Sequence, residues 1–104
     1  MTYENISPSE AKSRMDTNPE AVIVDVRRPD EFVTGHIPGA INVPLADIQD
    51  GNIPPCLADK NAVYLIYCRS GVRSVTAAVT LEKMGYTRLA NFGGILDWPY
   101  KIEH

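Results

Sequence analysis

The fold is decided by an apolar stretch that runs directly into a short polar loop, Ala62-Val63-Tyr64-Leu65-Ile66-Tyr67-Cys68-Arg69-Ser70-Gly71-Val72-Arg73-Ser74. Residues 62–67 carry β-branched and aromatic side chains without polar alternation, which is typical of a strand buried on both faces of a sheet. Beyond residue 74 the apolar side chains recur at helical spacing, and Gly85 provides a stop signal. A strand, a loop and a helix in this order indicate an α/β domain with a largely parallel sheet.

The remainder of the chain continues this alternation. Three further short strands are predicted at residues 21–26, 40–43 and 89–92. Two shorter helices are predicted from their start signals, the capping box Ser7-Pro8-Ser9-Glu10 and the segment 28–32, which ends at Gly35. Residues 45–61 are less regular, with one or two helical turns at 45–48 before Gly51 and Pro54-Pro55 break the chain.

The strand ends indicate where a ligand would bind. In parallel sheets, ligands bind beyond the carboxyl ends of the strands. Three predicted strands end there in Asp25-Val26-Arg27, in the loop from Cys68 to Arg73, and in Phe92-Gly93-Gly94. We therefore expect these three segments to form the site.

Length and charge exclude several classes of protein. The chain has 104 residues, of which 44% are apolar, so residues 1–104 are predicted to form one domain. A net charge of −3 argues against a nucleic-acid partner. No apolar run approaches the roughly 20 residues that span a bilayer, and residues 1–5 lack the features of a secretory signal. We therefore expect a cytoplasmic protein without a membrane partner.

The loop that begins at Cys68 has the features of a nucleophile in an anion-binding cup. A thiol between a strand and a helix N-terminus is favoured as the thiolate, and Arg69 and Arg73 add positive charge. Small residues at Ser70 and Gly71 allow several backbone amides to point inward. Because no acidic residue occurs between residues 59 and 82, the segment is locally cationic. A separate general base would then be unnecessary.

The chain resembles the rhodanese family of sulfurtransferases in the order and spacing of several motifs. These are Asp25-Val26-Arg27, Glu31-Phe32, Gly35-His36-Ile37-Pro38-Gly39-Ala40, Cys68-Arg69-Ser70-Gly71-Val72-Arg73, and Gly93-Gly94 followed by Trp98. The resemblance covers nearly the whole chain and implies a single rhodanese-like domain. Its fold would be a central, mostly parallel five-stranded sheet flanked by helices on both faces.

The resemblance also implies a reaction and a set of roles. Cys68 would attack the outer sulfur of thiosulfate, release sulfite, and pass the sulfur from a persulfide to cyanide or to a thiol. The loop residues Arg69, Ser70, Gly71, Val72 and Arg73 would bind the substrate, with the two arginines on the sulfonate end. We expect a small-molecule sulfur donor such as thiosulfate, a thiol or thioredoxin-like protein as acceptor, and no cofactor.

The residues give less support to three alternative interpretations. A non-enzymatic sulfur carrier or docking module of the same fold would also use a Cys68 persulfide or the intact loop. Cysteine-dependent phosphatases and arsenate reductases separate their cysteine and arginine by five residues, whereas four separate Cys68 from Arg73. The shorter loop fits a sulfur atom on the cysteine better than a phosphate group. A buried structural cysteine is disfavoured by the flanking arginines.

Several other residues are predicted to have structural roles. Asp25 and Arg27 are predicted to pair internally and hold the loop, and His36 is predicted to be a turn or packing residue. Cys56 has no charge pattern around it and is treated as incidental, although a disulfide with Cys68 is a testable alternative. The spacing of cysteines and histidines predicts no metal site. Because the chain has no second domain to enclose the site, we expect a shallow, solvent-accessible cup that suits a protein acceptor.

Overall fold

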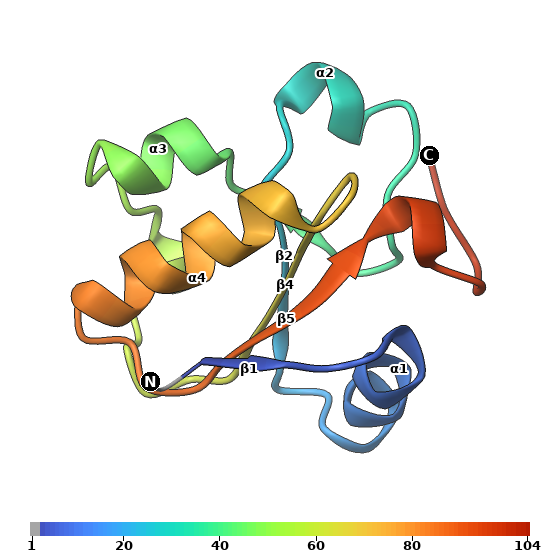
Figure 1. Ribbon diagram of the computed structural model, residues 1–104, viewed down its shortest axis with the longest axis horizontal. Helices are drawn as coiled ribbons and strands as arrows, with labels where there is room; N and C mark the ends of the chain where they lie inside the picture. The colour runs from blue at the N-terminus through green and yellow to red at the C-terminus, as the bar shows by residue number, and fades with distance from the viewer. Residues whose placement is uncertain (1–2) are drawn as a thin grey trace.

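Five parallel strands form the centre of the computed structural model, which describes residues 3–104 (Figure 1). Their order in the sheet is β1-β5-β4-β2-β3. The strands are β1 (Tyr3–Asn5), β2 (Val22–Asp25), β3 (Ile41–Asn42), β4 (Tyr64–Cys68) and β5 (Leu89–Gly94). The predicted α/β class and the five-stranded sheet are therefore confirmed.

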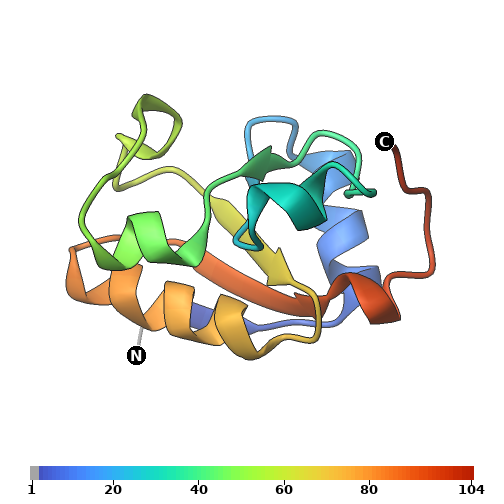
Figure 2. The same ribbon diagram turned by 90° about the horizontal axis from the view of Figure 1, so that it is seen from above.

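Helices cover both faces of this sheet, as Figure 2 shows. The described helices are α1 (Pro8–Thr17), α2 (Pro29–Phe32), which lies beyond the end of β2, α3 (Leu45–Gln49) and α4 (Val72–Lys83), with 3-10 turns at Pro55–Leu57 and Ile95–Asp97. Helices α3 and α4 pack on one face through a core that includes Ile48, Ala77 and Leu81. On the other face, Ala11 of α1 packs with Phe92 and Trp98. None of the helices within residues 3–104 is long and apolar enough to cross a membrane.

The central strand β4 is buried along its whole length, which explains its lack of polar alternation. Tyr64, Ile66 and Cys68 belong to the core beneath α3 and α4. The alternate residues Leu65 and Tyr67 belong to the core on the α1 face. This two-residue periodicity directs the Cys68 side chain toward α4.

Local signals predicted most element boundaries, with three differences. Strand β1 was not predicted, because its three residues are mostly exposed and pair only with β5. Strand β5 continues through both glycines to Gly94 instead of ending at residue 92. Ser7 caps α1 by accepting from the Glu10 amide, but the Glu10 carboxylate binds Arg14, so the predicted reciprocal capping box is only half formed.

Candidate active site

The loop after β4 lies against the end of β5, and glycines make this approach sterically feasible. A Cβ atom on Gly94 would overlap the Arg69 carbonyl oxygen and the Ser70 Cα atom. Gly71 adopts φ +102°, a conformation that L-residues rarely adopt, and a Cβ there would lie 3.3 Å from the Gly93 Cα atom. Gly94 and Gly71 therefore let the loop pack on the strand, and the predicted meeting of these two segments is confirmed.

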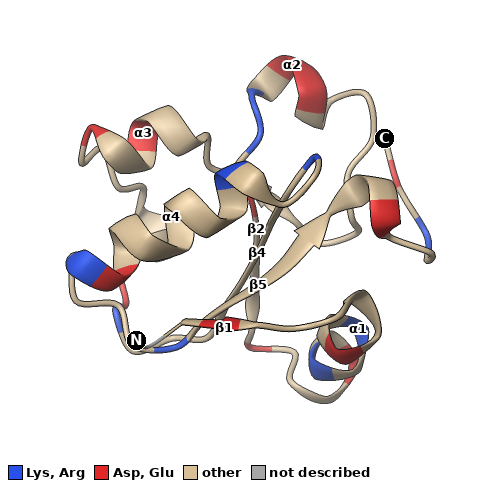
Figure 3. Ribbon diagram, viewed as in Figure 1, with Lys and Arg blue, Asp and Glu red and all other residues tan. Residues whose placement is uncertain are grey.

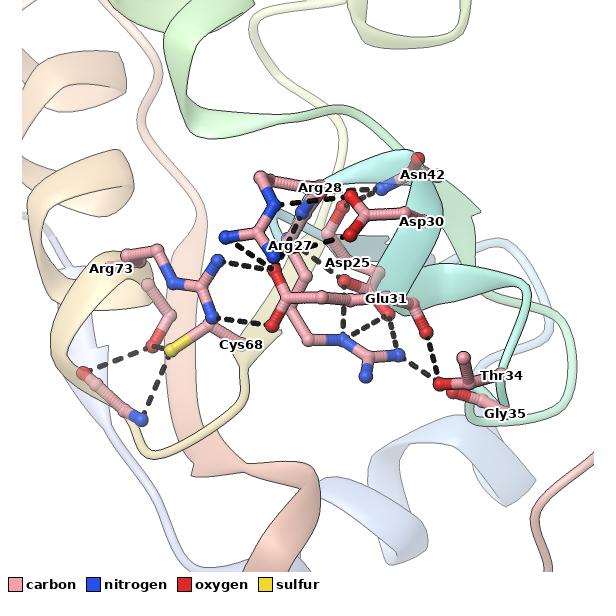
Figure 4. A network of polar contacts seen from close by, with 12 residues as sticks. Asp25, Arg27, Arg28, Asp30, Glu31, Thr34, Gly35, Asn42, Cys68 and Arg73 are labelled. Carbon is pink, nitrogen blue, oxygen red and sulfur yellow. Dashed lines mark hydrogen bonds and ion pairs between the residues drawn. The ribbon is translucent and has the colours of Figure 1, made fainter.

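Hydrogen-bonding groups of the loop and of the first turn of α4 surround the Cys68 sulfur (Figure 4). The Gly71 amide donates to Sγ at 3.0 Å, and the Ser74 Oγ atom lies 3.5 Å from it. The same Ser74 hydroxyl is 3.1 Å from the Gly71 carbonyl oxygen and 3.4 Å from the Gly93 carbonyl oxygen. Ser74 was not among the predicted site residues, although its position three residues after Gly71 places it on the same first turn of α4.

Opposing effects act on the pKa of Cys68, and stabilisation of the thiolate prevails. Burial raises the pKa of the thiol, whereas hydrogen bonds from the Ser74 hydroxyl and from the amides of Ser74, Gly71 and Ser70 lower it. The net direction is a pKa below the ordinary value for a thiol. The loop therefore favours an ionised sulfur, mainly through hydrogen-bond donors aimed at it.

Arg73 is held by an acidic residue from a distant part of the chain. Its Nη1 and Nη2 atoms donate to the two Glu31 carboxylate oxygens at 2.6 and 3.0 Å. This pair lowers the pKa of Glu31 to about 2, even though the partial burial of its carboxylate acts in the opposite direction. The prediction of a locally cationic loop was therefore incomplete, because α2 brings a carboxylate to it from 42 residues earlier.

Arg69 is in a different position from Arg73. Its side chain is exposed, and within residues 3–104 it has no ion-pair or side-chain hydrogen-bond partner. It lines an open cavity of about 330 Å³, which it shares with Arg27, Glu31, Gly35 and Leu96. Figure 3 shows the basic residues of the loop and of the first turn of α4 near the acidic residues of α2. Of the two loop arginines, Arg69 is therefore the one open to an incoming anion.

Asp25 and Arg27 form the expected internal ion pair at the end of β2. The Arg27 Nη2 atom lies 2.7 Å from Asp25 Oδ2, and the Arg27 amide donates to Asp25 Oδ1 at 2.9 Å. Arg27 Nη2 also donates to the Gly35 carbonyl oxygen at 2.7 Å, while the Asn42 side chain donates to the Asp25 and Arg27 carbonyl oxygens. These contacts fix the segment between β2 and α2 (Figure 4). Glu31 lies in α2, directly after this segment.

His36 makes packing contacts beside α2 and the C-terminal segment. Its ring stacks on Phe32 with the centroids 3.9 Å apart, and its Nδ1 atom lies 3.1 Å from the Phe32 carbonyl oxygen. Its backbone pairs with Glu103. These contacts agree with the structural role expected for His36. Within residues 3–104, no cluster of metal-binding side chains is present.

Cys56 lies near the opposite end of β4 from Cys68. It is exposed in the 3-10 turn Pro55–Leu57, whose Leu57 carbonyl oxygen accepts from Tyr86, and the ring of Tyr86 packs against Tyr64. Tyr64 and Cys68 are the two ends of β4, so roughly 13 Å of extended strand separates their Cα atoms. A disulfide requires Cα atoms within about 7 Å, so a bond between Cys56 and Cys68 would require a large rearrangement.

The structure corrects the expectation of an open cup around the sulfur. Arg69, Ser70 and Val72 on the rim are exposed, with Val72 72% accessible. Cys68 itself is 0% exposed, because the Gly71 amide and Ser74 lie over its sulfur. The rim is open, but the nucleophile is covered.

Comparisons with known proteins agree with this architecture. Thiosulfate sulfurtransferase PspE of Escherichia coli is 39% identical over 74 residues, which cover 71% of this chain and 70% of that protein. A sulfurtransferase of Allochromatium vinosum is 39% identical over 101 residues, covering 94% of this chain and 89% of the relative. The crystal structure of a rhodanese-like domain protein from Staphylococcus aureus superposes with a TM-score of 0.81 at 32% identity, covering 96% of both chains.

A family model supplies the assignment. The model for the rhodanese-like domain matches residues 7–100, a range that contains every predicted site residue from Asp25 to Arg73. The match also spans the strands whose ends form the site. The chain therefore belongs to the rhodanese-like domain family of sulfurtransferases.

Proposed function

We propose that this sulfurtransferase moves the outer sulfur of thiosulfate through a persulfide on Cys68 to cyanide or to a thiol acceptor. The observation that carries the proposal is the sulfur of Cys68, whose pKa is lowered by donors from Ser74 and the loop amides despite burial. A lowered pKa increases the fraction of the nucleophilic thiolate, so no adjacent general base is needed.

The reaction consists of two balanced displacements. In the first, the Cys68 thiolate attacks the outer sulfur of thiosulfate, the sulfur–sulfur bond breaks, and sulfite leaves with the bonding electron pair. In the second, cyanide or a thiolate attacks the terminal sulfur of the persulfide, and the Cys68 thiolate is released. The persulfide carries negative charge on its terminal sulfur, so inward-pointing amides of the loop are suited to hold it.

The acceptor is proposed to be a thiol, either small or presented by a thioredoxin-like protein. Exposed apolar side chains around the loop support a macromolecular acceptor. Val72 is 72% exposed, and Leu96, whose amide donates to the Arg69 carbonyl oxygen, is 62% exposed. Leu96 also lines the open cavity beside Arg69, where an acceptor thiol would approach.

Sulfur loading tests the proposal. The protein is incubated with thiosulfate and its intact mass is measured, with a gain of one sulfur atom expected for the wild type and for Cys56→Ser. Cys68→Ser should gain none. Sulfur uptake by Cys68→Ser would refute the assignment of the nucleophile, and no uptake by the wild type would indicate a docking role instead.

Turnover separates the remaining enzymatic functions. We expect thiocyanate formation from thiosulfate and cyanide, and no hydrolysis of an aryl phosphate. Phosphate release that depends on Cys68 would favour the phosphatase alternative. Loading without turnover by cyanide or by a small thiol would favour the sulfur-carrier alternative.

A further inference from the structure

Glu31 binds Arg73 in a geometry that engages one whole edge of the guanidinium. The two hydrogen bonds, at 2.6 and 3.0 Å, join both carboxylate oxygens to Nη1 and Nη2. Glu31 Oε1 also accepts from the Arg28 amide at 3.0 Å, which fixes the carboxylate at the start of α2. The Glu31 side chain is 16% exposed and the Arg73 side chain 31% exposed, so this ion pair is held in place and partly shielded from water.

The Glu31–Arg73 pair limits the number of arginine N–H groups with which the loop can bind an anionic sulfur donor. A sulfonate binds arginine best through paired N–H groups, and Glu31 already occupies one such pair on Arg73. Arg69 has no such partner within residues 3–104 and remains available at the cavity. With the Glu31 carboxylate and the Cys68 thiolate both ionised, the charges of the two loop arginines are balanced. A doubly charged donor therefore enters a site without excess positive charge.

We propose that Glu31 is a specificity-determining residue of the sulfur-donor site, which occupies Arg73 and thereby disfavours dianionic donors relative to singly charged ones. The inference rests on the proposed sulfurtransferase function and concerns the choice of donor within it. Thiosulfate represents the dianionic class, and an organic thiosulfonate such as benzenethiosulfonate represents the monoanionic class. In both, Cys68 attacks the outer sulfur and the sulfur–sulfur bond breaks; the leaving group is sulfite from the first and benzenesulfinate from the second.

The decisive variant is Glu31→Gln, which removes one negative charge and releases one edge of Arg73. We expect kcat/KM for thiosulfate to rise roughly five- to tenfold at low ionic strength, mainly through a lower KM. For benzenethiosulfonate the change should stay within about twofold. The selectivity between the two donors therefore shifts toward thiosulfate.

Asp30→Asn is the matched control for this charge change. Asp30 is the neighbouring residue on α2, its side chain is 70% exposed, and it pairs with Arg28 rather than with a loop arginine. The substitution removes the same charge from the same helix, so a long-range effect of net charge would appear in both variants. We expect Asp30→Asn to leave the selectivity between the two donors unchanged.

A double substitution shows whether Glu31 acts through Arg73. In an Arg73→Gln background, Glu31→Gln should no longer change the selectivity, because the guanidinium that it releases is absent. The conservative variant Glu31→Asp retains the charge and should keep selectivity close to that of the wild type. An equal gain for both donors in Glu31→Gln, or a gain that survives in the Arg73→Gln background, would overturn the inference.

Failure of the inference is distinguishable from failure of the proposed function. If the wild type forms a Cys68 persulfide with neither donor, the sulfurtransferase reaction itself is refuted. If it forms the persulfide with both donors and Glu31→Gln leaves their selectivity unchanged, only the role of Glu31 is refuted.

Discussion

The Ser74 hydroxyl has one proton and three acceptors within reach, the Cys68 sulfur and the carbonyl oxygens of Gly71 and Gly93. When Cys68 is protonated, the thiol can donate to Ser74 Oγ while the hydroxyl donates to the Gly71 carbonyl oxygen. When Cys68 is ionised, rotation of the same hydroxyl turns its proton to the sulfur. Ser74 can therefore follow the charge of the nucleophile without movement of the backbone.

Ser74→Ala is expected to raise the pKa of Cys68. The rising limb of the pH profile for persulfide formation should move to higher pH, because the thiolate fraction then increases only at higher pH. At neutral pH the rate should fall roughly five- to tenfold, the effect expected from losing one hydrogen bond to a charged group. Alkylation by iodoacetamide as a function of pH provides an independent measurement.

Thr76→Ala serves as the control for Ser74→Ala, because it removes an exposed hydroxyl that bonds only within α4. Its pH profile should match that of the wild type. A profile for Ser74→Ala that matches the wild type as well would show that the hydroxyl does not stabilise the thiolate.

Neutralising both loop arginines, as Arg69→Gln with Arg73→Gln, should also raise the pKa of Cys68. The shift should be smaller than that of Ser74→Ala, because Glu31 already balances the charge of Arg73. The same alkylation assay compares the two variants. A larger shift in the arginine double variant would make the side-chain charges, not the hydrogen bonds, the main source of thiolate stabilisation.

The two adjacent glycines of β5 differ in their contact with the Cys68 loop, so their substitution should have different effects. Gly94→Ala places a methyl group on the backbone of Arg69 and Ser70, so the strand or the Cys68 loop must shift. We expect a loss of roughly 2–3 kcal/mol in the free energy of unfolding and of most of the persulfide formation. Urea denaturation and intact mass after thiosulfate treatment measure these two effects.

Gly93→Ala is the paired comparison. Gly93 adopts φ +95°, but a Cβ atom there meets nothing within 4 Å. The substitution should therefore lower the free energy of unfolding only through the strained backbone conformation, by about 1–2 kcal/mol, and sulfur loading should be largely retained. Loading in Gly94→Ala as fast as in Gly93→Ala would show that the loop does not depend on its close approach to β5.

The pair of Asp25 and Arg27 joins the end of β2 to Gly35, which follows α2. Asp25→Asn leaves the buried Arg27 guanidinium without its counter-charge, which should lower the free energy of unfolding by roughly 3 kcal/mol. The exposed pair of Asp30 and Arg28 is again the control, and Asp30→Asn should change stability by less than about 0.5 kcal/mol. Equal losses in urea denaturation would contradict a special contribution from the buried pair.

Across the whole molecule, features encoded by neighbouring residues could be predicted and features that join distant segments could not. The succession of β4, loop and α4 follows from a continuous apolar run and a helical stripe, so the position of the Cys68 loop at the end of a buried strand could be predicted. Strand β1 depends on pairing with β5, more than 80 residues later, and its own residues carry little apolar signal. The hydrogen bonds from Glu31 to Arg73 likewise depend on the placement of α2 by the fold.

The burial of Cys68 is also a property of the whole molecule, because it results from α4, β5 and the loop closing over one sulfur. The absence of a second domain predicted an open cup, whereas packing within this one domain covers the thiol. A donor can reach the sulfur only after the loop amides or the Cys68 side chain move. Small donors need a smaller displacement than bulky ones.

The effect of burial on Cys68 can be measured by comparing its reactivity with that of Cys56 toward a bulky disulfide reagent such as Ellman's reagent. Cys56 is exposed and Cys68 is 0% accessible, so the native protein should label first at Cys56. Cys68→Ser should retain the fast phase, whereas Cys56→Ser should label roughly tenfold more slowly or worse, despite the lowered pKa of Cys68. In urea, where access is equal, the two single-cysteine variants should label at similar rates. Equally fast labelling of both native variants would mean that the Cys68 loop opens freely and that its cover imposes no barrier on the acceptor.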